Sequence, residues 1–585
     1  MKFFRLCIAV LILLSVIETP ALARENHEIS NELDNMVNSV IEAGNAKGAV
    51  LSIVKDGDTI LCKGYGFADE FHNIAADGEK IAFRIGSVSK TFVAVAVQIL
   101  HQEGHLDLNC DISTYLPPDF PPFSYPVNMY QLLTHTAGFE ETVTGMAVYN
   151  ISDTEPLAES IRNYVPAQAF KPGEVISYSN YGIALAAYVV ECITNQSFAQ
   201  YCRERIFLPL DMNHTTFEHM QDTAYVSKPY LPDGSETLEP YMNLYPEGSA
   251  VSTAEDMAKY MQWLLEEQDT RILSTTSKKE LFLRQFSMSE DLEGIGYVWS
   301  RKTRNNKLYY DKKGETLHFY TRIALYPEQQ TGIFLSFNTY LPEDKINAIM
   351  KKATDLLYGE SHLTDFRSNV ENLDINGLYV NNWSSNNTPE KILRYLIPGK
   401  TLNIRREADE TYSIHGEKMT LIGENLYASS IGILKFQEKG GKTFISTESA
   451  ITYSKVSWWH HRNVQILIPL LFFVSILTCF LRELSLIVRR RKKEYNIIPL
   501  AISLIQIISF FALCLLIYLG IIRFSLLMFV LPMKICGCII LSACTTETAY
   551  LIRIRSTDFR IKLIPICANL AGLLFCLWMF WFHIL

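Results

Sequence analysis

The chain has 585 residues and a net charge of −9. Single domains seldom exceed about 300 residues, so two or three structural units are expected. The acidic balance and the lack of a basic stripe before residue 480 argue against a nucleic-acid partner. Cysteine and histidine show no zinc-ligand spacing, so we expect no metal and no other cofactor.

The first 23 residues predict a secretory signal peptide. The segment MKFFRLCIAVLILLSVIETPALA has basic residues, a short apolar core and an A-x-A ending at Ala23. Cleavage is expected before Arg24, although an uncleaved membrane anchor fits the same pattern. We therefore expect the remaining chain to act outside the cytoplasm.

The next segments predict an amphipathic helix near Ile29–Ala43, a strand at Ala49–Val54 and a turn at Asp56-Gly57. Helical patterns dominate from Lys90 to about Trp263, and strand patterns return after residue 307. Strands at both ends with helices between them suggest one sheet built from the two ends of residues 28–358, plus a helical insertion. The later elements are expected at Leu308–Tyr310, Leu317–Tyr326, Thr331–Ser336 (strands) and Asp344–Leu357 (helix).

The tetrad Ser87-Val88-Ser89-Lys90 can supply a nucleophile and its base from one helical turn. It opens the apolar stretch TFVAVAVQIL, which has the pattern of a buried helix. Residues three apart share a helix face, so Lys90 can reach the hydroxyl of Ser87 and activate it. The second S-x-x-K match, Ser52 to Lys55, lies in a predicted strand, where such positions point to opposite faces. The alternative for Ser87 is a helix cap.

Residues 366–456 predict a small β-rich domain, because short apolar runs alternate there with Asn and Gly turns. We find no catalytic constellation in this region. Its strands are expected at Gly377–Val380, Thr401–Arg405, Thr411–His415, Ile431–Phe436 and Lys442–Ser446.

The last part, residues 464–585, predicts a membrane domain with four transmembrane helices. The basic run at residues 489–493 lies between the first two spans and should face the cytoplasm, which places the region before Val464 outside. Lys534 interrupts the third span; it marks a functional site or reaches the outer interface by snorkelling. The spans are expected at about Val464–Leu481, Ile497–Ile522, Leu526–Ile552 and Leu563–Phe582.

Four cysteines fall in the part expected outside the membrane, and they could form up to two disulfides whose pairing the sequence does not define. They are Cys62, Cys110, Cys192 and Cys202.

Several motifs, in the same order and spacing as in the family, resemble those of the penicillin-binding-protein-like serine hydrolases, in particular the class C β-lactamase branch. The resemblance covers roughly residues 30–357. It implies an α+β fold in which an antiparallel sheet is flanked by helices and joined by a helical subdomain. The matching segments are FRIGSVSK, LLTHTAGF at Leu132–Phe139, KPGEVISYSNYG, PEGSAVSTAEDMAKYM at Pro246–Met261 and ALYPEQQTGIFLSFN.

The resemblance implies further site residues beside Ser87 and Lys90. Tyr178, in Tyr178-Ser179-Asn180, can share the serine proton or protonate a leaving group, because the ammonium of Lys90 favours its anion. Asn180 can hydrogen-bond a substrate amide. A core tyrosine is the alternative for Tyr178.

The third family motif matches Lys312-Lys313-Gly314, followed by Glu315. Lys312 would favour a substrate carboxylate, and Gly314 would let the substrate approach the strand backbone. The backbone N–H groups of Ser87 and of about Glu315 would form the oxyanion hole. Glu315 is unusual for the family, and a solvated lysine pair in a turn is the alternative reading of the motif.

Two conspicuous residues are expected to carry no chemistry. His135 lies in a loop motif that the family uses structurally. Ser252 with Glu255 fits a capping box that opens a helix at Ala254–Leu265.

Together these observations predict a membrane-anchored extracytoplasmic serine hydrolase that acts through an acyl-enzyme on an amide or ester. A small-molecule or peptide substrate is expected, with peptidase-type substrates first: D-amino-acid peptides or a secreted peptide precursor. Esterase and β-lactamase activities are the next alternatives. A non-catalytic membrane sensor using the same pocket and a transporter-associated accessory protein remain as non-enzymatic alternatives.

Overall fold

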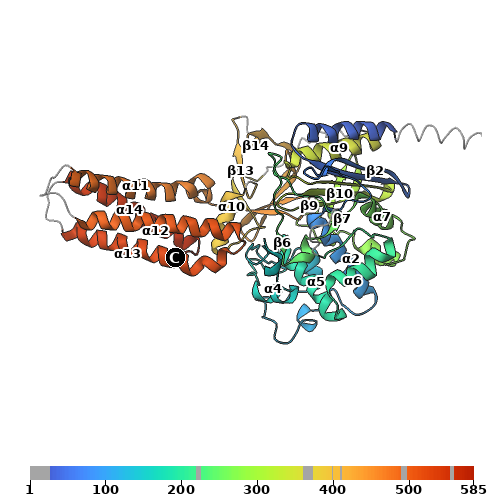
Figure 1. Cartoon of the computed structure of the whole chain (residues 1–585), viewed down its shortest axis with the longest axis horizontal. Coiled ribbons are helices and arrows are strands. Elements are labelled where there is room, and N and C mark those ends of the chain that lie inside the picture. Colours follow the sequence, from blue (N-terminus) through green and yellow to red (C-terminus); the bar gives the residue numbers. More distant parts are fainter. Residues whose placement is uncertain are drawn as a thin grey trace, which may run out of the picture.

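A computed structural model of the chain describes residues 27–218, 225–359, 373–397, 399–408, 411–488, 497–553 and 559–585. The predicted signal peptide, the expected start of the β-rich domain at residue 366 and the basic run at 489–493 lie outside these residues. A mixed α/β unit, a β-rich unit and four long helices follow one another along the chain, and the helices project to one side (Figure 1).

The α/β unit is built on a seven-stranded antiparallel sheet of order β3-β2-β1-β11-β10-β9-β8. Its central pair joins the two ends of the unit, with Leu51 opposite Leu335, as the sequence predicts. The turn at Asp56-Gly57 connects β1 to β2, and both residues have positive φ, which matches the twist of a two-residue hairpin. The strands are β1 (Gly48–Lys55), β2 (Asp58–Asp69), β3 (Ile74–Ala75), β8 (Ser300–Arg304), β9 (Lys307–Glu315), β10 (Tyr320–Tyr326) and β11 (Thr331–Phe337).

Helices cover both faces of this sheet (Figure 1). Leu51 and Ile53 of β1 share a core with a helix over residues 27–42 and with α9 (Glu343–Tyr358). Val50 and Val54 point to the other face, where α2 (Lys90–Gln102) and α7 (Ala254–Leu265) pack. Because side chains alternate along a strand, a strand buried on both faces is apolar throughout. The remaining helices of this unit are α3 (Met129–Leu133), α4 (Leu157–Asn163), α5 (Asn180–Thr194), α6 (Phe198–Cys202) and α8 (Thr275–Glu280).

One predicted helix cap is wrong. The N-cap of α7 is Thr253, whose side chain accepts a hydrogen bond from the N–H of Asp256 at 3.1 Å. Ser252 instead hydrogen-bonds Thr215 through its hydroxyl at 2.8 Å. Residue 252 is still in the short strand β7 (Val251–Ser252), which shifts the cap by one position.

The β-rich unit is a nine-stranded antiparallel sheet in which the first strand, β12, pairs with the last, β20. A buried cluster that includes Tyr379, Ile404, Phe436 and Ile445 fills its inner face. The predicted β-rich unit is confirmed, although the strand patterns missed β15, β16, β17 and β20. The strands are β12 (Gly377–Asn381), β13 (Thr401–Arg406), β14 (Tyr412–Ile414), β15 (Glu417–Lys418), β16 (Thr420–Gly423), β17 (Leu426–Ser429), β18 (Gly432–Lys439), β19 (Lys442–Thr447) and β20 (Thr452–Val456).

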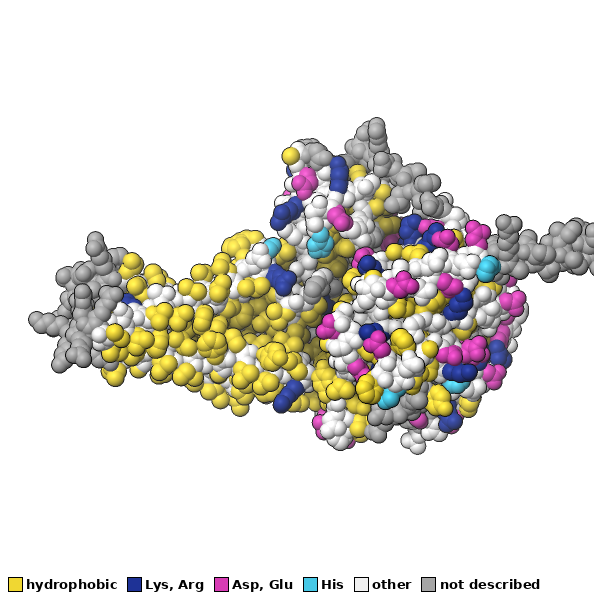
Figure 2. All heavy atoms as spheres, turned by 45° about the horizontal axis from the view of Figure 1, so that its top comes forward, with side chains coloured by type: hydrophobic (Ala, Val, Ile, Leu, Met, Phe, Trp, Pro, Cys, Tyr) yellow, Lys and Arg dark blue, Asp and Glu magenta, His cyan; other side chains and the backbone are white. Residues whose placement is uncertain are grey.

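Four helices at the C-terminal end of the described chain are long and apolar enough to cross a bilayer, as predicted. Their outward side chains form a continuous hydrophobic surface, yellow in Figure 2. Inside the bundle the rings of Phe472 and Phe575 stack with centroids 4.6 Å apart. The helices are α11 (Arg462–Val488), α12 (Ile497–Ile522), α13 (Val530–Arg553) and α14 (Phe559–Trp581).

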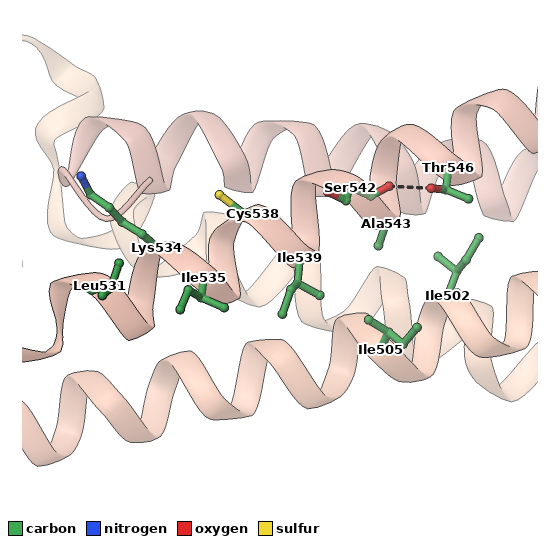
Figure 3. A pocket seen from close by; sticks show the side chains of 10 residues that line it. All are labelled: Ile502, Ile505, Leu531, Lys534, Ile535, Cys538, Ile539, Ser542, Ala543 and Thr546. Carbon is green, nitrogen blue, oxygen red and sulfur yellow. Dashed lines mark hydrogen bonds between the residues drawn. The ribbon is translucent and has the colours of Figure 1, made fainter.

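A groove of about 590 Å³ runs between α12 and α13 (Figure 3). Its lining is almost entirely apolar, and Lys534 lies at one end. Lys534 is close to the start of α13. This end of the helix meets the α/β unit, since Leu527, just before α13, donates its N–H to Thr144 Oγ1 at 3.1 Å. This position near a helix end fits the snorkelling alternative.

Among the described residues, the four cysteines that precede the helical bundle form no disulfide. Each is a free thiol: Cys62, Cys110, Cys192 and Cys202.

Candidate active site

Ser87 lies at the junction between a 3-10 turn, η1 (Gly86–Ser89), and the buried helix α2. Its hydroxyl oxygen accepts a hydrogen bond from Lys90 Nζ at 2.7 Å and another from the Tyr178 hydroxyl at 2.8 Å. Ser89, not Ser87, occupies the position before α2, and it makes no side-chain cap. The cap alternative for Ser87 is therefore wrong, and the structure brings Ser87, Lys90 and Tyr178 together.

Lys90 is fully buried and makes three hydrogen bonds. Besides Ser87, it donates to the backbone oxygen of Glu247 and to Glu247 Oε2, both at 2.6 Å. Burial alone would lower the pKa of Lys90, but the nearby Glu247 carboxylate and Tyr178 raise it overall. Lys90 is therefore an ammonium in the resting site.

The motif matches did not single out Glu247, although it lies within the matched segment PEGSAVSTAEDMAKYM. Its side chain is 3% exposed and belongs to the 3-10 turn η6 (Tyr245–Glu247). The signal that could have found Glu247 is an acidic residue in a segment that packs against the buried helix α2, because a buried carboxylate needs a partner.

Tyr178 lies among aromatic rings and lysine side chains. The His135 ring lies 4.3 Å from its ring centroid, and the Nζ atoms of Lys90 and Lys312 each lie 5.2 Å from it. Burial raises the pKa of Tyr178, and Lys90 opposes this effect without reversing it. Tyr178 is therefore a neutral phenol that donates a proton, rather than the anion that the sequence argument favoured.

His135 supports Tyr178 and remains uncharged. Burial, with Lys312 and Lys90 nearby, holds the pKa of His135 well below its usual range. Its Nδ1 faces the N–H of Ser179 at 3.3 Å, so the ring contacts two consecutive residues of the second motif. This packing agrees with the structural role expected from the sequence.

Asn180 begins α5, directly after its N-cap Ser179. Its side-chain amide donates to Glu141 Oε1 at 2.7 Å and its backbone N–H donates to Glu141 Oε2 at 3.1 Å. The side-chain oxygen of Asn180 is buried and has no hydrogen-bond partner. One buried acceptor of Asn180 thus has no partner within the described protein.

The third motif lies on β9, next to the Ser87 turn. Gly314 is required there because a Cβ would lie 2.0 Å from the carbonyl oxygen of Ile85, so its nearest neighbour is protein backbone, not a substrate path. A Cβ on Gly86 would likewise meet the N atom of Glu315 at 2.7 Å. The backbone of Glu315 therefore lies against the Ser87 turn, where the oxyanion hole is expected.

Lys312 and Glu315 differ in their surroundings. Lys312 is 5% exposed and donates to the Val298 oxygen at 3.0 Å; burial, together with the Lys90 charge, holds its pKa well below its usual range. The Glu315 carboxylate pairs with Lys313 at 2.6 Å. The alternative of a solvated lysine pair is wrong for Lys312, which is buried beside Tyr178.

The β-rich unit contributes a wall to the site. The Trp383 ring packs against Tyr178 with centroids 5.1 Å apart. Lys400 Nζ lies 3.4 Å from the Trp383 ring centroid and donates to its backbone oxygen at 2.7 Å. No pattern in the sequence connected this unit to the site, because Trp383 lies in a connection between two strands.

The segment Glu140–Gly145 joins all three parts of the chain. Glu140 Oε2 accepts the N–H of Asn386 at 2.7 Å, and Glu390 of the β-rich unit accepts the N–H groups of Val143 and Thr144 at 2.7 and 2.8 Å. Gly145 donates its N–H to Phe524 at 2.9 Å, in the connection between α12 and α13. The candidate site is therefore built beside the helical bundle.

The Beta-lactamase family model matches residues 33–353. Protein flp of Staphylococcus aureus (strain MW2) is 28% identical over 337 residues, which are 55% of this chain and 66% of flp. PbpX of Bacillus subtilis (strain 168) is 30% identical over 237 residues, or 39% of this chain and 57% of PbpX. The chain thus spans just under two thirds of the length of flp.

The crystal structure of SurE aligns with 74% of this chain and with all of its own chain, at 15% identity and a TM-score of 0.53. This likeness concerns the fold. It agrees with the fold that the motifs imply. The predicted α+β, β-lactamase/transpeptidase-like fold is therefore confirmed. Since the family model covers more than half of its residues, the chain belongs to the Beta-lactamase family.

Proposed function

We propose that this chain is a membrane-anchored serine hydrolase that acts outside the cytoplasm through an acyl-enzyme on Ser87. The observation that carries the proposal is the pair of hydrogen bonds to Ser87 Oγ, from Lys90 at 2.7 Å and from Tyr178 at 2.8 Å. A serine hydroxyl needs such neighbours to become a nucleophile at neutral pH.

Each site residue then has a role. Ser87 attacks the carbonyl carbon, Lys90 takes part in removing its proton, and Tyr178 protonates the leaving group. Asn180 binds the substrate amide. The substrate lies along the strand that carries Lys312 and Glu315, and Gly314 lets this strand pack against the Ser87 turn. The N–H groups of Ser87 and Glu315 stabilise the oxyanion.

Peptidase-type substrates are proposed first, as D-amino-acid peptides or a secreted peptide precursor. The unpartnered oxygen of Asn180 supports this choice, because an amide substrate offers an N–H where an ester does not. Esterase and β-lactamase activities are the alternatives within the same site.

A membrane sensor that binds without turnover is the competing proposal. It needs a pocket but no nucleophile, whereas here a buried lysine and a tyrosine both contact one serine oxygen. The same covalent experiment separates the two proposals.

The test uses the detergent-solubilised full chain with a fluorescent penicillin and a fluorophosphonate, beside Ser87→Ala and Lys90→Ala. Labelling that depends on Ser87 supports covalent catalysis, and its absence with both probes rejects it. Labelling without turnover of a D-peptide panel favours the sensor. A cytoplasmic reporter fused after Lys493 should be active, and an inactive reporter would reverse the proposed topology.

A further inference from the structure

The resting state of Lys90 poses a problem for the proposed reaction. An ammonium has three N–H donors and no lone pair. The three contacts of Nζ, with Ser87 Oγ, the Glu247 backbone oxygen and Glu247 Oε2, use all three donors. Lys90 cannot take the Ser87 proton until it has given one away.

Glu247 is the group placed to receive that proton. Its Oε2 lies 2.6 Å from Lys90 Nζ, and both side chains are almost completely buried, at 3% and 0% exposure. A proton shared between two buried groups this close moves without crossing solvent. The uncharged amine–carboxylic acid form is also less disfavoured by burial than two separate ions.

Resting on the proposed function, we infer that Glu247 is the proton acceptor behind Lys90, so that Ser87 is activated through a Lys90–Glu247 pair. Glu247 touches no reacting carbon and acts through Lys90; it is a positioning residue that also holds a proton.

One proton passes from Lys90 Nζ to Glu247 Oε2, which leaves a neutral amine and a neutral acid. The amine takes the proton of Ser87 while the Oγ–carbon bond forms and the carbonyl electron pair moves onto oxygen. When the carbon–nitrogen bond breaks, the leaving nitrogen takes the Tyr178 proton, Lys90 restores Tyr178, and Glu247 returns its proton to Lys90.

Other titratable groups face this pair from several elements. None of them combines a carboxylate with direct contact to Lys90: Glu141 hydrogen-bonds Asn180, and neither Lys312 nor His135 carries a carboxylate. The facing groups are Tyr178 before α5, Lys312 on β9, and His135 and Glu141 on the segment that follows α3.

The pair predicts a distinctive pH profile. The resting ion pair and its reactive neutral form contain the same number of protons, so the rate of Ser87 modification should not change with pH over a wide range. Without the Glu247 carboxylate, Lys90 itself must lose a proton to solvent before it can act. Burial lowers that pKa, and the rate should then rise with pH until Lys90 is neutral.

The test measures fluorophosphonate labelling of the full chain from about pH 6 to about pH 9, a range between the reference pKa values of carboxyl and lysine groups. The probe releases fluoride as the oxygen–phosphorus bond forms, so no leaving group needs a proton and only nucleophile activation is measured. The wild-type rate should vary by less than about threefold, whereas Glu247→Gln should be at least about 100-fold slower at pH 6 and recover as pH rises.

Two further variants separate charge from packing. Glu247→Asp keeps the carboxylate and should keep the flat profile at a lower rate. Glu191→Gln changes a half-buried carboxylate that accepts a hydrogen bond from Tyr245 of the same 3-10 turn, and it should behave as wild type.

The inference is overturned if Glu247→Gln shows the wild-type profile, or a rate lowered equally at all pH values. If Glu247→Gln does not fold, Glu247→Asp decides the matter, because loss of the flat profile in a variant that keeps the carboxylate contradicts the shared proton. Failure of the wild type to label at Ser87 would instead reject the proposed function.

Discussion

The indole of Trp383 packs edge-on against the phenol of Tyr178, with ring centroids 5.1 Å apart and an interplanar angle of 69°. Trp383 belongs to the β-rich unit and Tyr178 to the α/β unit. A unit without catalytic motifs of its own therefore helps to orient the tyrosine that contacts Ser87.

Removing this ring should slow the step in which Tyr178 gives up its proton. An aromatic pair contributes about 1 kcal/mol beyond its buried area, so Trp383→Ala should slow acylation by fluorescent penicillin roughly fivefold. The control is Trp458→Ala, which removes an indole that is 76% exposed near the start of α11. Equal rates for the two variants would show that Trp383 does not support the site.

Tyr178→Phe should distinguish the two covalent probes. The ring nitrogen of a penicillin needs a proton when its bond breaks, whereas the fluoride of a fluorophosphonate does not. We expect penicillin acylation to fall by about 100-fold or more, and fluorophosphonate labelling by less than about tenfold. The two second-order labelling rates measure this difference, and an equal loss with both probes would show that Tyr178 acts on the nucleophile instead.

Asp311 anchors a buried charge cluster next to Lys312. Its carboxylate pairs with Arg322 at 2.6 Å and with Lys302 at 2.7 Å. Removing one member of a buried ion pair costs about 3–5 kcal/mol, so Asp311→Asn should lower the thermal transition of the full chain. Asp119→Asn removes an ion pair with Arg162 on an exposed carboxylate and should leave the transition unchanged.

The pH dependence of this cluster has a defined sign. Burial would raise the pKa of Asp311, but Arg322 and Lys302 outweigh it and hold the pKa well below its usual range. The stabilisation is complete above the unfolded-state pKa of about 4 and is lost as pH falls toward the folded-state pKa. The difference between wild type and Asp311→Asn should therefore shrink below about pH 4. A difference that grows on acidification would contradict this assignment.

Glu390 should hold the segment beside the active site against the β-rich unit. Glu390→Ala leaves the N–H groups of the half-buried Val143 and the buried Thr144 without their acceptor. Each unsatisfied donor costs about 1–3 kcal/mol, so these amides should exchange with deuterium roughly 5- to 100-fold faster. Glu424→Ala, at an exposed position of the same unit, is the matched control. Unchanged exchange in Glu390→Ala would show that the junction is held elsewhere.

Local patterns predicted much of the fold because they report burial directly. The apolar runs of β1 and α2 follow from their positions in the core, and the four apolar helices follow from their length. Strands with weak alternation, such as β16 and β17, were missed, since their residues are only partly buried. The cap at Thr253 depended on where β7 ends, which the helix pattern does not contain.

The site was predicted only as far as motif spacing reaches. Ser87, Lys90 and Tyr178 meet because η1, α2 and the start of α5 pack together, and the motifs mark these three places. Glu247 lies 157 residues from Lys90 along the chain. Asn382, the neighbour of Trp383, lies 205 residues from its partner Ser177, the neighbour of Tyr178. Such contacts arise from tertiary packing, which spacing along the chain does not report.

The central claim is that Ser87 is the nucleophile, and mass spectrometry of the fluorophosphonate-treated full chain tests it most directly. The peptide Ile85–Lys90, released by cleavage after Arg84 and Lys90, should carry one phosphonyl group on Ser87 in the wild type. That adduct should be absent in Ser87→Ala. An unmodified peptide in the wild type under conditions that label a control serine hydrolase, or equal labelling of Ser87→Ala at another residue, would contradict the account.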